Sequence, residues 1–171
     1  LNRADTAITI LQDFILRPGV TKELVAKAKL DLGDYYIIKE EPWESTLLYT
    51  QVEKDFKGSP LGEEAKYRNA RNAYFKGDFE WAQSQLKIIK SNTSEFISND
   101  AIHLSVFITD NLNQDSVQVS LQQYAKAELL LFQNKTEETI ATYQAILKAQ
   151  PGHPLEDDIY MQLAKIARSR Q

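Results

Sequence analysis

The stretch AYFKGDFEWA, residues 73–82, contains the signals that decide how this chain folds. Gly77 is placed where one helix would end, and glycine adopts the left-handed backbone conformation of a helix C-cap without steric cost. Asp78 is a favourable N-cap for a following helix. Ala82 is small enough to let the two helices approach closely. We therefore predict a helical hairpin that turns at Gly77-Asp78, with a positive φ at Gly77 and a buried Ala82.

Helical periodicity extends along the chain on both sides of this hairpin. Apolar residues recur at intervals of three and four, which is typical of amphipathic helices. Glycine and proline, only 6 and 5 in 171 residues, mark short connections that should make consecutive helices antiparallel. The expected helices are 4–16, a second one capped by Thr21 and ending near 39, a third from Pro42 to about 56, 61–76 and 79–91.

Internal similarity indicates a repeat protein. Residues 44–73 align without a gap on residues 138–167, and 8 of the 30 positions are identical, including Tyr49/Tyr143 and Pro60/Pro154. A shorter pattern also recurs. It consists of a small residue at position i and large, mainly apolar residues at positions i+4 and i+7. Its four sets are Ala7/Leu11/Phe14, Ser45/Tyr49/Val52, Ala82/Leu86/Ile89 and Thr139/Tyr143/Ile146.

The intervals between these sets predict one irregularity. Their first members are 38, 37 and 57 residues apart, and the first two intervals suit one helix pair per repeat. The third interval is longer by about one helix, so residues 94–112 should contain an extra or lengthened element. We expect a single repeat domain over residues 1–171.

Composition excludes several classes of function. The net charge of −4 argues against a nucleic-acid partner, which favours a basic surface. The chain has no cysteine, which removes disulfides and thiolate chemistry. No apolar run reaches the roughly 18 residues of a membrane-spanning helix, so direct membrane insertion is not expected. The opening LNRADTAITIL suggests a piece of a longer protein.

Several of these residues resemble the tetratricopeptide repeat (TPR) family. LGDYY (32–36) is similar to its Leu-Gly-x-x-Tyr signature, Ala82 and Thr139 stand at its small-residue position, and Pro151 stands at its terminal proline. The chain departs from the signature at Asn69-Ala70 and Lys126-Ala127. The segment SPLGEEAKYRNA (59–70) is similar to TPR proteins of bacterial cell envelopes, and the Asn-rich style to large TPR proteins of Bacteroidetes.

The resemblance implies a fold and a binding surface. The fold is all-α, a right-handed α-solenoid of antiparallel helix hairpins with about nine helices. In that family the first helix of each hairpin lines a concave groove, and aromatic residues with arginine are typical of binding hot spots. The groove residues implied for the central and later repeats are Glu64, Tyr67, Arg71, Tyr74, Phe75, Tyr124, Glu128, Leu131 and Phe132. Those implied for the preceding repeat are Lys27, Leu30, Asp34, Ile37 and Ile38. A cell-envelope or periplasmic location is favoured by the resemblance alone.

Few residues indicate chemistry. Asp100 and His103 are three apart on an expected helix, a spacing that could orient an imidazole, but no nucleophile accompanies them. His153 precedes Glu156, Asp157 and Asp158, which could form an oxygen-rich ion site or simply occupy the first turn of the last helix. We favour the second interpretation, and expect no catalytic residue, no metal and no cofactor.

Two hypotheses for the function follow. The first is a non-catalytic interaction module or assembly scaffold that binds a partner peptide or helix in the concave groove. The alternative is a self-associating or spacer segment of a larger envelope protein, so a homo-oligomer is possible.

Overall fold

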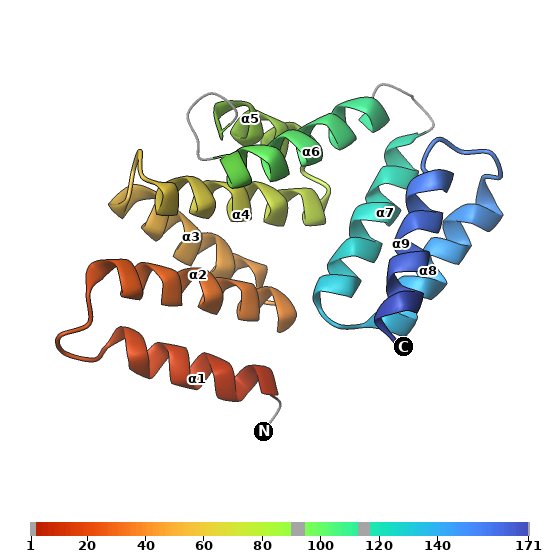
Figure 1. Ribbon diagram of the computed structural model, residues 1–171. Coiled ribbons are helices and arrows are strands. Elements are labelled where there is room, and N and C mark those ends of the chain that lie inside the picture. Colours follow the sequence, from red (N-terminus) through yellow and green to blue (C-terminus); the bar gives the residue numbers. More distant parts are fainter. Residues whose placement is uncertain (1–2, 90–94, 113–116, 171) are drawn as a thin grey trace. The chain divides into compact units, whose positions relative to one another are not determined.

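The computed structural model describes residues 3–89, 95–112 and 117–170. Within these residues the chain forms nine α-helices and no β-strand, which confirms the all-α prediction (Figure 1). The helices are α1 (Arg3–Ile15), α2 (Lys22–Ile38), α3 (Pro42–Asp55), α4 (Pro60–Lys76), α5 (Phe79–Ile89), α6 (Glu95–Leu112), α7 (Val117–Phe132), α8 (Thr136–Ala149) and α9 (Glu156–Ser169). The chain divides into two compact units, residues 1–74 with 78–105 and residues 75–77 with 106–171.

The predicted helices agree with the observed ones to within one or two residues. Thr21 is the N-cap of α2, and its hydroxyl accepts a hydrogen bond from the Leu24 N–H at 3.4 Å. The extra element expected at 94–112 is one helix, α6, with Ser94 outside the described residues. The predicted end of the fifth helix, residues 90–91, also lies outside them.

In the part of the chain that the structure describes, three helices end in the same left-handed turn. The residue after the C-cap has positive φ at Glu40 (66°), Gly77 (84°) and Asn134 (62°). The next N–H reaches back to close each turn: Glu41 donates to Tyr36 O at 2.8 Å, Asp78 to Ala73 O at 3.0 Å and Lys135 to Leu130 O at 2.8 Å. This is the Schellman arrangement, which satisfies carbonyls that a helix end leaves unpaired. The prediction of a positive φ at Gly77 is confirmed.

Each turn is followed five residues later by a small, fully buried side chain. Ser45, Ala82 and Thr139 are 0% exposed, so the prediction for Ala82 is confirmed. The large residues that follow them are at most 1% exposed: Tyr49, Val52, Leu86, Ile89, Tyr143 and Ile146. Burial of one such side chain stabilises by about 1.5–3 kcal/mol. The described residues therefore contain three hairpins of one design, with first helices α2, α4 and α7 and second helices α3, α5 and α8.

Neighbouring hairpins also pack on one another within each unit. In the first unit α2 contacts both α1 and α3, and Asn72 of α4 donates to Pro42 O (3.1 Å) and Thr46 Oγ1 (3.0 Å) of α3. In the second unit α8 contacts α7 and α9. The core of that unit is formed by Tyr124, Ala127, Tyr143, Ile146, Leu155, Ile159 and Ile166.

Gly33 of α2 lies directly against α3. Its carbonyl accepts a hydrogen bond from the Ser45 hydroxyl at 2.7 Å. A Cβ atom at Gly33 would overlap the ring of Tyr49, which is itself 0% exposed. The close approach of these two helices therefore depends on the missing side chain.

We expect Gly33→Ala to lower the free energy of unfolding by about 1–2 kcal/mol, although alanine favours helix by about 1 kcal/mol. The cause is the overlap with the Tyr49 ring. Urea unfolding of the single variants and of Gly33→Ala/Tyr49→Leu tests this, because the double variant reproduces the Ala70/Leu86 pair of the second hairpin. The cost of the alanine should disappear once leucine has replaced Tyr49. An equal cost in both backgrounds would contradict the steric explanation.

Candidate functional site

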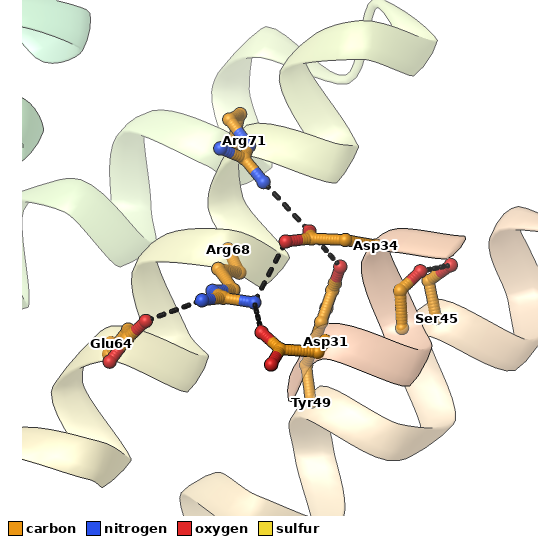
Figure 2. Close-up of polar contacts among 8 residues, drawn as sticks. Asp31, Asp34, Ser45, Tyr49, Glu64, Arg68 and Arg71 are labelled. Atoms are coloured by element: carbon orange, nitrogen blue, oxygen red, sulfur yellow. Dashed lines mark hydrogen bonds and ion pairs between the residues drawn. The ribbon is translucent and has the colours of Figure 1, made fainter. Parts of the chain in front are cut away.

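Asp34 is the centre of a cluster of charged residues on α2 and α4 (Figure 2). Its carboxylate accepts hydrogen bonds from the Tyr49 hydroxyl at 2.7 Å, Arg68 Nη1 at 2.8 Å and Arg71 Nη2 at 2.9 Å. These donors come from α3 and α4, so one carboxylate joins three helices of the first unit. Hydrogen bonds to an ionised partner are stronger than neutral ones, which makes this a rigid connection.

Arg68 extends the cluster towards solvent. It donates through Nη2 to Glu64 at 2.6 Å and through Nη1 to Asp31 at 3.4 Å, in addition to Asp34. Its side chain is 17% exposed, whereas that of Asp31 is 59% exposed. Burial disfavours the charged form of Arg68, but the carboxylates of Asp34 and Glu64 outweigh it and raise its pKa. Arg68 is therefore a permanent cation that Asp34 and Glu64 hold in place.

The pKa of the Tyr49 phenol is also raised, first by burial and then by the negative charge of Asp34. Tyr49 therefore remains a proton donor to Asp34. On the other side of the cluster, the Arg71 guanidinium lies 6.0 Å from the centre of the Tyr67 ring. Arg71 is thus oriented by Asp34 and stacked near an aromatic ring, and both Tyr67 and Arg71 are half-buried.

Three of the predicted groove residues lie together in the structure, and a fourth is buried in the core. Glu64, Tyr67 and Arg71 are all half-buried on α4 and belong to or adjoin the cluster. Tyr74 is only 1% exposed, because Phe79 packs against its ring with the centroids 5.7 Å apart. A side chain so deeply buried offers no surface to a partner, so the prediction that Tyr74 lines a groove is wrong.

The predicted groove residues of the second unit also differ in burial. Tyr124 is 2% exposed, between Phe107 (centroids 5.0 Å apart) and Tyr143 (5.3 Å), so its assignment to a groove is also wrong. Its pKa is raised, mainly by burial and then by Glu128. Glu128 is half-buried, and Phe75 packs on Phe132 with the centroids 5.8 Å apart.

Two of the five groove residues predicted for the preceding repeat are buried as well. Leu30 and Ile37 are each 1% exposed, so they belong to the core of the first unit. Lys27 is exposed and Ile38 is half-buried. Of these five residues, Asp34 has the most polar contacts in the part of the chain that the structure describes.

Sequence reasoning missed the contributions of Asp31, Tyr49 and Arg68. A signal for them was present: Asp31 and Arg68, like Asp34 and Arg71, are opposite charges separated by 37 residues, the interval of the repeat. Corresponding positions on neighbouring first helices lie side by side when the hairpins stack. Opposite charges at equivalent positions of neighbouring repeats therefore indicate an ion pair between those repeats.

A hollow of about 490 Å³ lies beside the cluster, between α1 and α2. Its wall on α1 is apolar, whereas α2 contributes two carboxylates and a phenol. The lining residues are Ala7, Ile10, Leu11, Asp31, Asp34 and Tyr35. The hollow therefore offers an apolar wall and an acidic wall, which together suit a side chain with an apolar stem and a basic end.

The residues that suggested chemistry lie on two separate helices, α6 and α9, and in the turn before α9. His103 and Asp100 are both exposed on α6. The His153 Nδ1 accepts a hydrogen bond from the Leu155 N–H at 3.0 Å, and Glu156 accepts one from the Gly152 N–H at 2.8 Å. Glu156, Asp157 and Asp158 form the first turn of α9, as predicted. Among the described residues no group of three or more acidic or histidine side chains could hold a metal ion.

Within residues 3–89, 95–112 and 117–170, no helix is both long and apolar enough to cross a membrane. Comparison of the chain with protein-family models, with curated proteins and with solved structures finds no match.

Proposed function

We propose that this chain is a non-catalytic protein-interaction module, a right-handed solenoid of TPR-like hairpins that binds a peptide or helix of a partner protein. Three hairpins with the same turn, the same buried small residue and a repeat interval of 37 residues between the first two support the solenoid. The binding surface lies on α4 and is formed by Glu64, Tyr67 and Arg71.

The observation that carries this proposal is the arrangement of Tyr67 and Arg71. Both side chains are half-buried, and Asp34 fixes the guanidinium 6.0 Å from the tyrosine ring. A partner that contacts them meets little loss of side-chain entropy, because the surface is already ordered. Aromatic residues and arginine are also the residues that dominate binding energy at protein interfaces.

The charges of the cluster indicate the chemistry of the partner. Three carboxylates (Asp31, Asp34 and Glu64) meet two guanidiniums, so the cluster has an excess of negative charge. Its outermost acids are Asp31 and Glu64, with side chains 59% and 34% exposed. The partner segment should therefore place a basic side chain next to an apolar one.

A peptide library selected on the 171-residue chain tests the proposal. For the selected peptides we expect Tyr67→Ala and Glu64→Gln each to weaken binding about tenfold, because an ordered hot-spot contact contributes more than 1 kcal/mol. Higher salt should weaken binding through the acidic residues. The measurement is fluorescence anisotropy, with circular dichroism to show that each variant remains helical.

Trp43→Ala is the matched control, since Trp43 is a 77% exposed aromatic residue on α3. It should change the dissociation constant less than twofold. Peptides that lose affinity with Trp43→Ala but not with Tyr67→Ala would contradict the assignment to α4.

A further inference from the structure

A second hollow, of about 350 Å³, lies inside the first hairpin, between the start of α2 and the end of α3. Its lining is mainly apolar but includes two lysines and one aspartate: Val20, Lys22, Val25, Ala26, Lys29, Asp55 and Phe56. A volume of this size is within the range of pockets that bind small molecules. None of the lining residues belongs to the proposed partner surface on α4.

Charged side chains lie at both ends of this hollow. At one end the Lys29 ammonium donates a hydrogen bond to the amide oxygen of Gln51 at 3.0 Å. Asp55 follows Gln51 by one turn of α3, and Lys22 precedes Lys29 by two turns of α2. Because the two helices of a hairpin are antiparallel, Lys22 and Asp55 lie together at the other end. The apolar lining on α2 lies between the two lysines.

The equivalent lysine of the next hairpin, Lys66, has two carboxylate partners. It follows Lys29 by 37 residues, the repeat interval, and its ammonium lies 3.8 Å from a carboxylate oxygen of Glu53 and of Glu63. The side chains of Lys66 and Glu63 are only 15% and 9% exposed. At this position of the repeat, a half-buried ammonium is therefore neutralised by carboxylates, as charges removed from water require.

The first hairpin has neither of these carboxylates. One repeat earlier, the positions of Glu53 and Glu63 are those of Leu16 and Ala26. In the described part of the chain, no carboxylate lies within ion-pair distance of the half-buried Lys29, whose hydrogen-bond partner is a neutral amide. Ala26 lines the hollow one turn from Lys29, so its short side chain leaves space that a carboxylate of another molecule can enter.

We propose that this hollow binds a small monocarboxylate with an apolar body. The ligand carboxylate pairs with the Lys29 ammonium, as Glu63 does with Lys66 in the next hairpin. The apolar body packs on Val25 and Phe56.

The far end of the hollow makes the site selective for a single carboxylate. Lys22 and Asp55 carry opposite charges there, so that end has no net charge to attract a second carboxylate. A dicarboxylate would lose the hydration of its second charge without gaining a partner for it.

NMR titration of the 171-residue chain with 3-phenylpropionate tests the site. The backbone amide signals of Val25, Ala26 and Phe56 should shift and saturate, with a dissociation constant of about 1 mM for a ligand of this size. Two relatives of this ligand should each bind at least about tenfold more weakly. They are 3-phenylpropanamide, which lacks the charge, and adipate, which has a second carboxylate instead of the ring. Equal binding of either one, or shifts that do not saturate, would overturn the proposal.

Ala26→Glu gives the sharpest result, because it places beside Lys29 the carboxylate that Lys66 has in Glu63. This variant should not bind 3-phenylpropionate. Lys29→Met removes the charge with little change in length, so it should weaken binding at least about tenfold even if Ala26→Glu lowers stability. Lys27→Met, at an exposed position of α2 outside the lining, is the matched control and should change the dissociation constant less than twofold.

Unchanged affinity in Lys29→Met, or equal losses in Lys29→Met and Lys27→Met, would overturn the proposal. Tyr67→Ala and Glu64→Gln, which test the partner surface on α4, should bind 3-phenylpropionate like the unmodified chain. Either proposal can therefore fail without the other.

Discussion

Replacement of Asp34 by alanine is expected to lower the free energy of unfolding of the first unit by about 2–4 kcal/mol. The Tyr49 hydroxyl would lose its acceptor in a side chain that is 0% exposed, and Arg68 and Arg71 would lose the carboxylate that they share. Leaving a buried donor unsatisfied costs more than the bond itself contributes. Urea unfolding followed by tryptophan fluorescence measures the loss, because both tryptophans, Trp43 and Trp81, lie in this unit.

Two variants separate the charge of Asp34 from its hydrogen bonds. Asp34→Asn retains an oxygen for Tyr49 and should cost less than Asp34→Ala. Asp31→Ala removes a carboxylate of the same cluster that is 59% exposed and 3.4 Å from Arg68, so it should cost at most about 0.5 kcal/mol. Equal losses for Asp31→Ala and Asp34→Ala would show that the cluster is a surface feature without a structural role.

The hairpins could be predicted from the sequence because their signals are local. Gly77 marks one turn, and the small residues Ser45, Ala82 and Thr139 mark the positions where two helices meet. The left-handed turns at Glu40 and Asn134 were less evident, since neither residue is glycine. There the hydrogen bonds of the turn and the packing of the hairpin stabilise a backbone conformation that local propensity alone disfavours.

The candidate surface was predicted less well, because exposure depends on neighbours that are distant in the sequence. A helix turns by about 100° per residue, so Tyr67 and Tyr74, seven residues apart, lie within about 20° of each other on α4. Helical phase therefore assigns them the same environment. They differ because Tyr74 lies close to the turn between α4 and α5, where Phe79 of α5 packs on its ring.

That difference predicts opposite effects for two tyrosines of one helix. Tyr74→Ala should lower the free energy of unfolding by about 3–5 kcal/mol, the usual cost of removing a buried aromatic side chain. Tyr74 is 1% exposed and its loss would leave a cavity beside Phe79. Tyr67→Ala removes the same atoms from a half-buried position and should cost no more than about 1 kcal/mol. Urea unfolding followed by the fluorescence of Trp43 and Trp81 measures both.

Binding measurements on the same pair of variants complete the argument. Tyr74→Phe keeps the ring that packs on Phe79, so it should cost much less stability than Tyr74→Ala and preserve the affinity for a selected peptide. Tyr67→Ala should remain folded and lose affinity. If Tyr74→Ala is as stable to urea as the unmodified chain, the core assignment of Tyr74 is wrong. If Tyr74→Phe weakens peptide binding in a fully folded protein, the hydroxyl of Tyr74 reaches the partner and the surface on α4 extends to the hairpin turn.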